Sequence, residues 1–322
     1  MTGNHLIDVQ NLEVRFPIKR GILQKTVGHI RAVDNISFAI APCETLGLVG
    51  ESGCGKTTTG RAMLKLNEPT GGKIFYQDKD ILPMKEPEFR ELRRNLQIIF
   101  QDPYSSLNPR QTVKGLISEV LTVKCGYSKE DAAREVSNLL EQVGLSPTYA
   151  SRYPHEFSGG QRQRIAIAKA LALQPKFIVC DEAVSALDVS IQSQIINLLM
   201  ELKDQYQMTY LFISHALNVV QHISDRVAVM YLGKIVELAS TDEIFAHAAH
   251  PYTQALISAI PLLSGQQKRE RIILKGEVPG AAHVPPGCRF HTRCPHATKA
   301  CLEMVPELRD IGGGHLAACH QL

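Results

Sequence analysis

Short apolar runs that end at polar, glycine or proline residues recur along the chain. Their lengths and boundaries are typical of buried strands, and segments with helical spacing separate most of them. Such alternation predicts an α/β fold in which a mainly parallel sheet is covered by helices. The predicted core strands are residues 45–49, 95–100, 176–182, 209–215 and 226–231.

The first 80 residues or so favour β-structure of another kind. Residues 6–16 alternate, imperfectly, between apolar and polar positions, as a strand with one solvated face does. Residues 31–40 and 73–76 read as further strands, and a turn rich in glycine precedes the second of these. Residues 19–29 are polar and contain glycine, which predicts a loop.

Helical spacing dominates residues 112–173. Within this stretch, residues 128–131 form a capping box that opens a helix ending near Val143. A second strong helix begins at Ser158, and Pro175 ends its run. Two more helices are predicted at residues 190–205 and 217–224.

The composition allows a large core and excludes a membrane-spanning protein. The chain has 322 residues, enough for two domains or for one large domain with an appendage, and 44% of them are hydrophobic. The formal net charge of +3 argues neither for nor against a nucleic-acid partner. No apolar run approaches the ~20 residues that a spanning helix needs, and the first residues lack the order of a signal peptide. We therefore expect a cytosolic protein that reaches a membrane only through partners.

The strand at 45–49 leads into G-E-S-G-C-G-K-T, which satisfies the phosphate-loop pattern G-x-x-x-x-G-K-[ST]. Glycines let successive backbone N–H groups turn toward phosphate oxygens, and the helix start that follows adds free donors and a partial positive charge. The lysine can reach the outer phosphates, and the threonine hydroxyl can bind Mg²⁺. The predicted nucleotide-binding residues are Gly50, Glu51, Ser52, Gly53, Cys54, Gly55, Lys56, Thr57 and Thr58, with Thr57 also a Mg²⁺ ligand.

Polar residues close three of the other predicted core strands. Asp181 and Glu182 end an apolar run, and the carboxyl ends of parallel strands are where ligands bind in open α/β sheets. Asp181 can hold Mg²⁺, and Glu182 can act as a general base on water. Gln101 can point into the site or remain a surface glutamine. His215 can donate to a γ-phosphate or orient the water, although a lone histidine is more often structural.

The helix that begins at Ser158 offers a second anion site. The sequence Ser158-Gly159-Gly160-Gln161 combines glycine N–H groups with a helix N-terminus. One chain therefore carries two phosphate-binding faces.

These stretches in combination resemble the ATP-binding cassette (ABC) ATPases of transporters, and the resemblance covers most of the chain. Residues 157–161 (FSGGQ) resemble the family's signature, with Phe157 at the usual leucine position. The resemblance makes Gln101 the counterpart of the family's Q-loop glutamine, which also contacts Mg²⁺. It makes His215 the counterpart of the switch histidine. Residues 185–188 (SALD) match the D-loop, which ends at Asp188.

The resemblance implies a P-loop NTPase (RecA-like) α/β core with an antiparallel β subdomain. An α-helical signature subdomain would be inserted at about 103–157. The ATP-binding domain would span 1–255, and a small extension containing cysteines would span 256–322. Two subunits would clamp each ATP between the phosphate loop of one and the signature of the other, with Glu182, His215 and Gln101 as the catalytic residues.

Residues 99–110 (IFQDPYSSLNPR) and 250–256 (HPYTQAL) narrow the resemblance to the ATPases of bacterial dipeptide and oligopeptide importers. Nickel importers share much of this pattern, so nickel or another small solute is the alternative cargo. The implied partners are a second ATPase, usually a paralogue, two integral-membrane permeases and an external substrate-binding protein. The chain would then lie at the cytoplasmic face of the membrane.

Two other kinds of cassette protein rank lower. One is a cassette protein that acts on ribosomes or DNA, but such proteins usually carry two cassettes or a long coiled-coil insertion. The other is a regulatory subunit that binds ATP without hydrolysing it. No nucleic-acid partner is expected.

Three positions depart from the family pattern. Ala183 replaces a usual proline, Ala216 replaces a usual acid, and the adenine-binding position near Ile30 lacks an aromatic residue. We therefore expect adenine to rest on an aliphatic surface, with less stacking energy.

Four of the eight cysteines, Cys288, Cys294, Cys301 and Cys319, fall close together near the end of the chain. Four cysteines suffice for Zn²⁺ or an iron–sulfur cluster, but the spacing matches no common zinc or ferredoxin pattern. Residues 286–295 resemble the tail of peptide-importer ATPases, some of which hold a [4Fe–4S] cluster. That cluster is our first expectation, Zn²⁺ with help from His291 or His296 the second, and free thiols the third.

Overall fold

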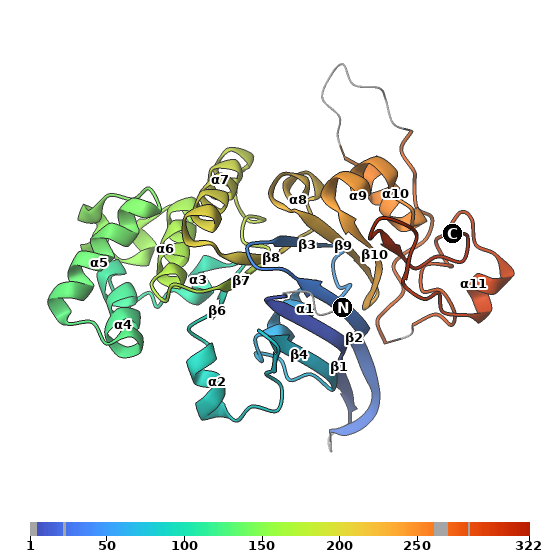
Figure 1. Ribbon diagram of the computed structural model, residues 1–322, viewed down its shortest axis with the longest axis horizontal. Coiled ribbons are helices and arrows are strands. Elements are labelled where there is room, and N and C mark those ends of the chain that lie inside the picture. Colours follow the sequence, from blue (N-terminus) through green and yellow to red (C-terminus); the bar gives the residue numbers. More distant parts are fainter. Residues whose placement is uncertain (1–4, 22–23, 261–269, 283) are drawn as a thin grey trace. The chain divides into compact units, whose positions relative to one another are not determined.

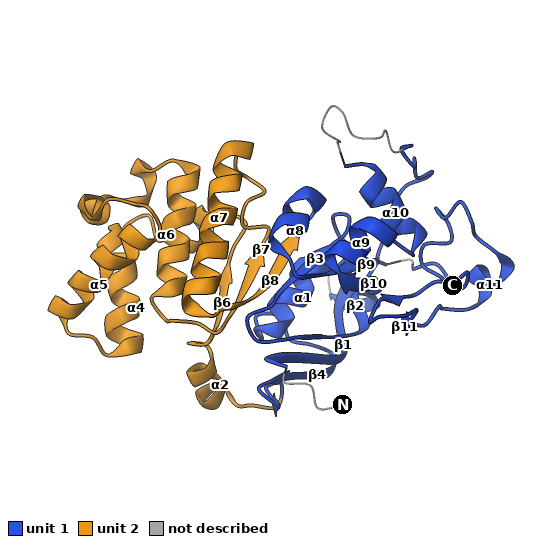
Figure 2. Ribbon diagram, turned by 45° about the horizontal axis from the view of Figure 1, so that its top comes forward, with its two compact units in different colours: residues 1–82, 214–322 blue, residues 83–213 orange. Residues whose placement is uncertain are grey.

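The computed structural model describes residues 5–21, 24–260, 270–282 and 284–322 (Figure 1). The chain divides into two compact units, residues 1–82 with 214–322 and residues 83–213 (Figure 2). The boundary expected at 255/256 lies inside the first unit.

An antiparallel sheet in the first unit has the strand order β2-β1-β4-β5. Its strands are β1 (Ile7–Arg20), β2 (Lys25–Ile40), β4 (Gly71–Tyr76) and β5 (Lys79–Asp80). The prediction of a loop at residues 19–29 is wrong. Strands β1 and β2 extend into this stretch as a hairpin, in which Lys19 pairs with Thr26. This end of the hairpin is mostly exposed, so it lacks the apolar face by which a strand is recognised in sequence.

A second set of strands in this unit includes the buried strand β3 (Thr45–Val49). β3 pairs in parallel with β9 (Arg226–Tyr231), which pairs antiparallel with β10 (Lys234–Ser240). Helix α8 (Leu217–Ile223) packs so tightly on β3 that a Cβ at Gly47 would overlap Val220. The other helices of the unit are α1 (Lys56–Met63), α9 (Thr241–His247), α10 (Pro251–Ser258) and α11 (Lys299–Glu303).

The C-terminal residues extend the same sheet. β12 (Leu316–Ala317) pairs antiparallel with β10, and β11 (Arg309–Asp310) pairs with β12. Phe290 is almost fully buried and packs edge-on against Tyr231 of β9, with ring centroids 5.2 Å apart. The last part of the chain is therefore built into the unit that carries the phosphate loop.

The second unit contains three parallel strands, as the apolar runs predicted. β7 (Phe177–Asp181) lies between β6 (Leu96–Ile99) and β8 (Thr209–Ser214), with Ile178 opposite both Gln97 and Tyr210. Its helical segments are α2 (Glu86–Leu92), α3 (Pro103–Ser106), α4 (Val113–Cys125), α5 (Lys129–Gln142), η1 (Pro147–Ser151), η2 (Pro154–Glu156), α6 (Gly159–Leu171) and α7 (Val189–Tyr206).

Capping explains two of the helix starts. Ser158 and Gln161 form a complete capping box at α6, because each side chain bonds the backbone N–H of the other residue. The box expected at Ser128 is half formed: Ser128 caps α5, but the carboxylate of Asp131 accepts from the Ser128 hydroxyl. Aspartate is one methylene shorter than glutamate, so it stops at the hydroxyl. None of the helices among the described residues is long and apolar enough to cross a bilayer.

Candidate functional site

The phosphate loop joins β3 to α1 in the predicted strand–loop–helix order. Gly50, Gly53 and Gly55 have φ angles of 152°, 79° and 110°, a region that glycine enters at little cost. A Cβ at Gly50 would overlap the carbonyl oxygen of Met230, and one at Gly55 would overlap that of Ala32. The backbones of β9 and β2 therefore press directly on the loop and fix its curl.

Lys56 lies inside this curl, with a side chain that is 4% exposed. Its Nζ donates to the carbonyl oxygens of Gly50 at 2.8 Å and Glu51 at 3.1 Å. Thr57 and Thr58 are partly exposed in the first turn of α1. The curled loop thus brings the Lys56 ammonium group close to the N-terminus of α1. An ammonium group beside backbone N–H donors is an arrangement that binds a polyphosphate.

Cys54 is a packing residue of the loop. It is 2% exposed, and burial raises the pKa of its thiol, against the opposing effect of Lys56. A buried thiol with a raised pKa is a poor nucleophile at neutral pH.

Glu51 is held from two directions that sequence reasoning missed. Its backbone N–H donates to the Tyr252 hydroxyl at 2.9 Å. Its carboxylate accepts two hydrogen bonds from Arg293, at 2.7 Å and 3.2 Å. Both partners come from parts of the chain that follow the ATP-binding motifs, so local spacing gave no signal of them.

The surface expected to hold adenine contains an aromatic side chain. Ile30 pairs with Phe16 across β1 and β2, and directly paired residues share one face of a sheet. Phe16 is 39% exposed. Ile30 lies two positions before Ala32, whose carbonyl oxygen is packed against Gly55 of the phosphate loop. An aromatic side chain thus lies beside Ile30, so the surface there is not purely aliphatic, while the adenine position itself stays a prediction. The alternation of Leu12, Val14 and Phe16 was the available signal.

In the second unit, Gln101 and Glu182 meet at the carboxyl end of the parallel strands. The Gln101 amide donates to the Glu182 carboxylate at 3.0 Å and to the Ser185 hydroxyl at 3.3 Å. Asp181, the last residue of β7, is 2% exposed. Three polar residues that the sequence singled out or placed in a motif thus form one hydrogen-bonded group beside Asp181.

Glu182 has an unusual backbone, with φ of 49°. This left-handed conformation costs a non-glycine residue on the order of 1–2 kcal/mol. Its N–H donates to the Ile213 carbonyl at 3.0 Å, and its own carbonyl accepts from the Ser185 N–H at 3.1 Å. Such strain is retained where the surroundings fix a side chain's direction.

The predicted second anion site lies at the start of α6. Ser158 and Gly159 are exposed, whereas Gly160 is buried against α7, where a Cβ would overlap Ile191. Gly159 is thus available to an anion, and Gly160 permits close helix packing. Asp188 caps α7, accepting from the Ile191 N–H at 3.0 Å, and this bond lowers the pKa of its carboxyl.

His215 follows β8 and leads into α8. Ala216 occupies the helix N-cap, where it supplies no side-chain acceptor, and its own N–H donates to the Ser214 hydroxyl at 3.0 Å. Ala183 is buried, with 2% exposure. Of the two alanines that depart from the family pattern, Ala216 therefore affects the N-cap of α8, and Ala183 occupies a buried, packed position.

The four C-terminal cysteines are close neighbours and form no disulfide. Cys288 donates its backbone N–H to the Cys301 carbonyl at 2.8 Å. Burial raises the pKa of Cys288 to about 11, and the charges of Cys301, Cys294 and Cys319 add to the effect. In the described part of the chain, no group of three or more His, Cys, Asp or Glu residues is arranged to hold a metal ion.

Comparison with known proteins agrees with this geometry. Residues 33–185 match the family described as "ABC transporter", and residues 236–301 match "Oligopeptide/dipeptide transporter, C-terminal region". The chain is 51% identical over 318 residues to the oligopeptide transport ATP-binding protein AppF of Bacillus subtilis, covering 98% of this chain and 97% of that protein. It is 48% identical to a putative peptide import ATP-binding protein of Brucella ovis, covering 99% and 98%.

Solved structures give the same result. One is cbiO1 from Clostridium perfringens, part of an ABC transporter complex, with a TM-score of 0.65 and 26% identity over 76% of this chain and 92% of that chain. Another is a dimeric ATP-binding cassette in a post-hydrolysis state with ADP and phosphate, with a TM-score of 0.65 and 25% identity over 73% and 98%. The chain belongs to the ATP-binding proteins of the ABC transporter family, in the group that carries the oligopeptide/dipeptide transporter C-terminal region.

Proposed function

We propose that this ABC ATPase hydrolyses ATP to power the import of dipeptides or oligopeptides through a membrane transporter. The names of its relatives and the matched C-terminal region support a peptide as the cargo. Nickel or another small solute is the alternative. The hydrogen bond between Gln101 and Glu182, at the carboxyl end of β7, supports the proposal that this chain hydrolyses ATP.

ATP would be held first by the phosphate loop. Residues 50–58 supply backbone N–H groups, and Lys56 would exchange its bonds to Gly50 and Glu51 for the outer phosphates. Thr57, Asp181 and Gln101 are the proposed Mg²⁺ ligands, because hydroxyl, carboxylate and amide oxygens suit this ion. Mg²⁺ would neutralise charge on the phosphates. The proposed adenine surface is Ile30 with Phe16, which adds stacking.

Hydrolysis would depend on Glu182 as the general base. Its carboxylate would take a proton from the attacking water, and Gln101 would direct that carboxylate and respond to the γ-phosphate. His215 would donate to the γ-phosphate or orient the water. The fixed backbone of Glu182 limits the positions that its carboxylate can take.

A second subunit would complete each site. Ser158, Gly159, Gly160 and Gln161 would bind the γ-phosphate held by the other subunit, with Asp188 beside that contact. We propose a paralogous ATPase as the partner, and we place both ATPases at the cytoplasmic face of the membrane. Two permeases and an external binding protein would complete the transporter. Purification with integral-membrane subunits would support this assembly; purification with ribosomes or DNA would contradict it.

We also propose a [4Fe–4S] cluster on Cys288, Cys294, Cys301 and Cys319, with Zn²⁺ as the alternative. Four cysteines without disulfides supply the kind and number of donors that a cluster needs, although the described structure does not arrange them around a metal ion. The buried Cys288 resists ionisation, so a bound metal would be needed to hold its thiolate. When bound, a cluster would cross-link this segment. Iron and sulfide in the anaerobically purified protein would support the cluster, whereas zinc or no metal would exclude it.

The substitution Glu182→Gln tests the catalytic proposal. It keeps the size of the side chain and its bond to Gln101 but removes the base, so we expect hydrolysis to fall by about 100-fold or more while Mg-ATP stays bound. Both are measured on the chain purified with its transporter. Glu201→Gln, on the exposed face of α7, is the matched control. Undiminished hydrolysis in Glu182→Gln would remove Glu182 from its role.

A further inference from the structure

A compact turn near the end of the chain runs from Cys288 to Cys294, and we refer to it as the clasp. Its backbone is closed by three internal hydrogen bonds, from His291 N–H to the Cys288 carbonyl and from the Arg293 and Cys294 N–H groups to the Phe290 carbonyl, each at 3.0 Å. The Cys288 N–H bonds the Cys301 carbonyl at 2.8 Å. These bonds give the clasp a defined shape.

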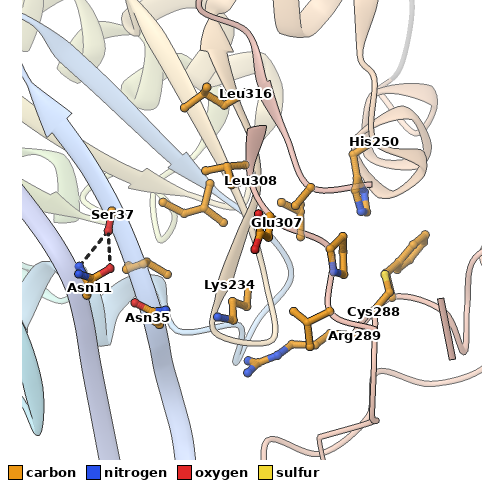
Figure 3. A pocket seen from close by; sticks show the side chains of 17 residues that line it. Asn11, Asn35, Ser37, Lys234, His250, Cys288, Arg289, Glu307, Leu308 and Leu316 are labelled. Carbon is orange, nitrogen blue, oxygen red and sulfur yellow. Dashed lines mark hydrogen bonds between the residues drawn. The ribbon is translucent and has the colours of Figure 1, made fainter. Parts of the chain in front are cut away.

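Two buried contacts fix the clasp to the nucleotide-binding strands. Arg289, with a side chain 8% exposed, donates to the Asp34 carboxylate of β2 and to the carbonyl of Leu232, next to β9. Phe290 packs against both Tyr231 and Tyr252, with ring centroids 5.2 Å and 5.4 Å away. Figure 3 shows Cys288 and Arg289 consecutive on this segment at a cavity of about 600 Å³, with the guanidinium directed away from Cys288.

Arg293 extends from the clasp to the phosphate loop. Its two terminal nitrogens bond both carboxylate oxygens of Glu51, at 2.7 Å and 3.2 Å, and the side chains are 8% and 28% exposed. A bidentate arginine–carboxylate pair is stronger and more directional than a single neutral bond. Glu51 is the second residue of the loop, and its carbonyl also accepts from Lys56. Arg293 therefore holds the residue whose carbonyl accepts from Lys56, the lysine of the phosphate loop.

The charge of this pair matters because the loop binds an anion. An unpaired carboxylate on Glu51 would repel the triphosphate, and the partly buried position would weaken screening by solvent. Arg293 offsets this negative charge, and the Tyr252 hydroxyl fixes the Glu51 backbone. The clasp thus both orients Glu51 and cancels its charge.

We propose that Arg293 is a positioning residue for ATP, through which the C-terminal clasp sets the affinity of the phosphate loop. The proposal deepens the proposed function, since it assigns the C-terminal segment a part in ATP binding. It differs from a purely structural role for this segment in requiring that the defect of an Arg293 variant depend on the charge of Glu51.

The test measures the dissociation constant of Mg-ATP on the purified full chain, for the wild type, Arg293→Gln, Glu51→Gln and the double variant. We expect Arg293→Gln to weaken binding about tenfold, the scale of a lost charged hydrogen bond. Adding Glu51→Gln should recover most of that loss, because the unpaired carboxylate is gone. Arg293→Lys should fall between, since it keeps the charge and loses the bidentate geometry.

Arg309→Gln, at an exposed arginine of β11, is the matched control and should bind ATP as the wild type does. Thermal unfolding of every variant separates loss of fold from loss of affinity. Unchanged ATP binding in folded Arg293→Gln, or a defect that Glu51→Gln leaves in place, would overturn the proposal. A wild-type chain that does not bind Mg-ATP would instead contradict the proposed function itself.

Discussion

At the scale of single residues, sequence spacing predicted the chemistry that is local in the chain. The phosphate loop is a contiguous pattern, and Glu182 follows a recognisable apolar strand. Gln101 was singled out because it ends a strand, and parallel pairing brings that strand beside β7. The contact between Arg293 and Glu51 joins positions 242 residues apart, so no spacing rule could have found it.

Phe16 carries a prediction at this scale. If adenine stacks on it, Phe16→Ala should weaken Mg-ATP binding about fivefold, because an aromatic contact contributes on the order of 1 kcal/mol. Inorganic tripolyphosphate lacks the base, so its affinity should not change. Val27→Ala, at an exposed position of the same hairpin, is the control, and equal affinities of Phe16→Ala and wild type for ATP would contradict stacking.

At the scale of elements, strands with a buried face and helices with strong caps were predictable. β7 and α6 appear where the apolar run and the Ser158 cap placed them. The distal end of the β1–β2 hairpin was not predictable, since its exposed polar residues look like a loop and its strands are recognised by their pairing with each other. That error also concealed Phe16, because the pairing of Phe16 with Ile30 depends on the same hairpin.

The start of α10 carries a prediction about pH. His250 is 1% exposed and caps this helix, accepting from the Tyr252 N–H at 3.1 Å. Burial lowers the pKa of His250 from 6.5 to about 4. The unfolded chain therefore binds the proton more readily, so stability is fully present above pH 6.5 and is lost as pH falls toward 4.

This loss should reach about 3 kcal/mol, measured by denaturant unfolding between pH 7 and 4. His250→Asn keeps a capping acceptor but cannot titrate, so its stability should fall less over the same range. Parallel curves for the two proteins would show that His250 does not contribute to acid sensitivity.

At the scale of the whole molecule, the two compact units carry the two different surfaces that we propose to bind phosphate. The first holds the phosphate loop with Arg293 and Phe16, and the second holds the start of α6 with Gln101 and Glu182. Both surfaces were inferred from sequence motifs, and phosphate binding by them stays a prediction. The sequence did not predict that the C-terminal segment is built into the first unit, because short strands such as β11 and β12 carry too few residues to show a pattern.

ATP is proposed to join two such subunits, each supplying the start of α6 to the other's phosphate loop. The most direct measurement is analytical ultracentrifugation of the Glu182→Gln chain, which reports whether the subunits are single or paired. It is made with and without Mg-ATP, on the chain alone and on the chain mixed with the proposed paralogous ATPase. We predict that Mg-ATP converts separate subunits into a stable pair, and that Ser158→Glu, which places a negative charge at the start of α6, prevents this. Subunits that bind Mg-ATP yet remain separate at every nucleotide concentration would contradict the account.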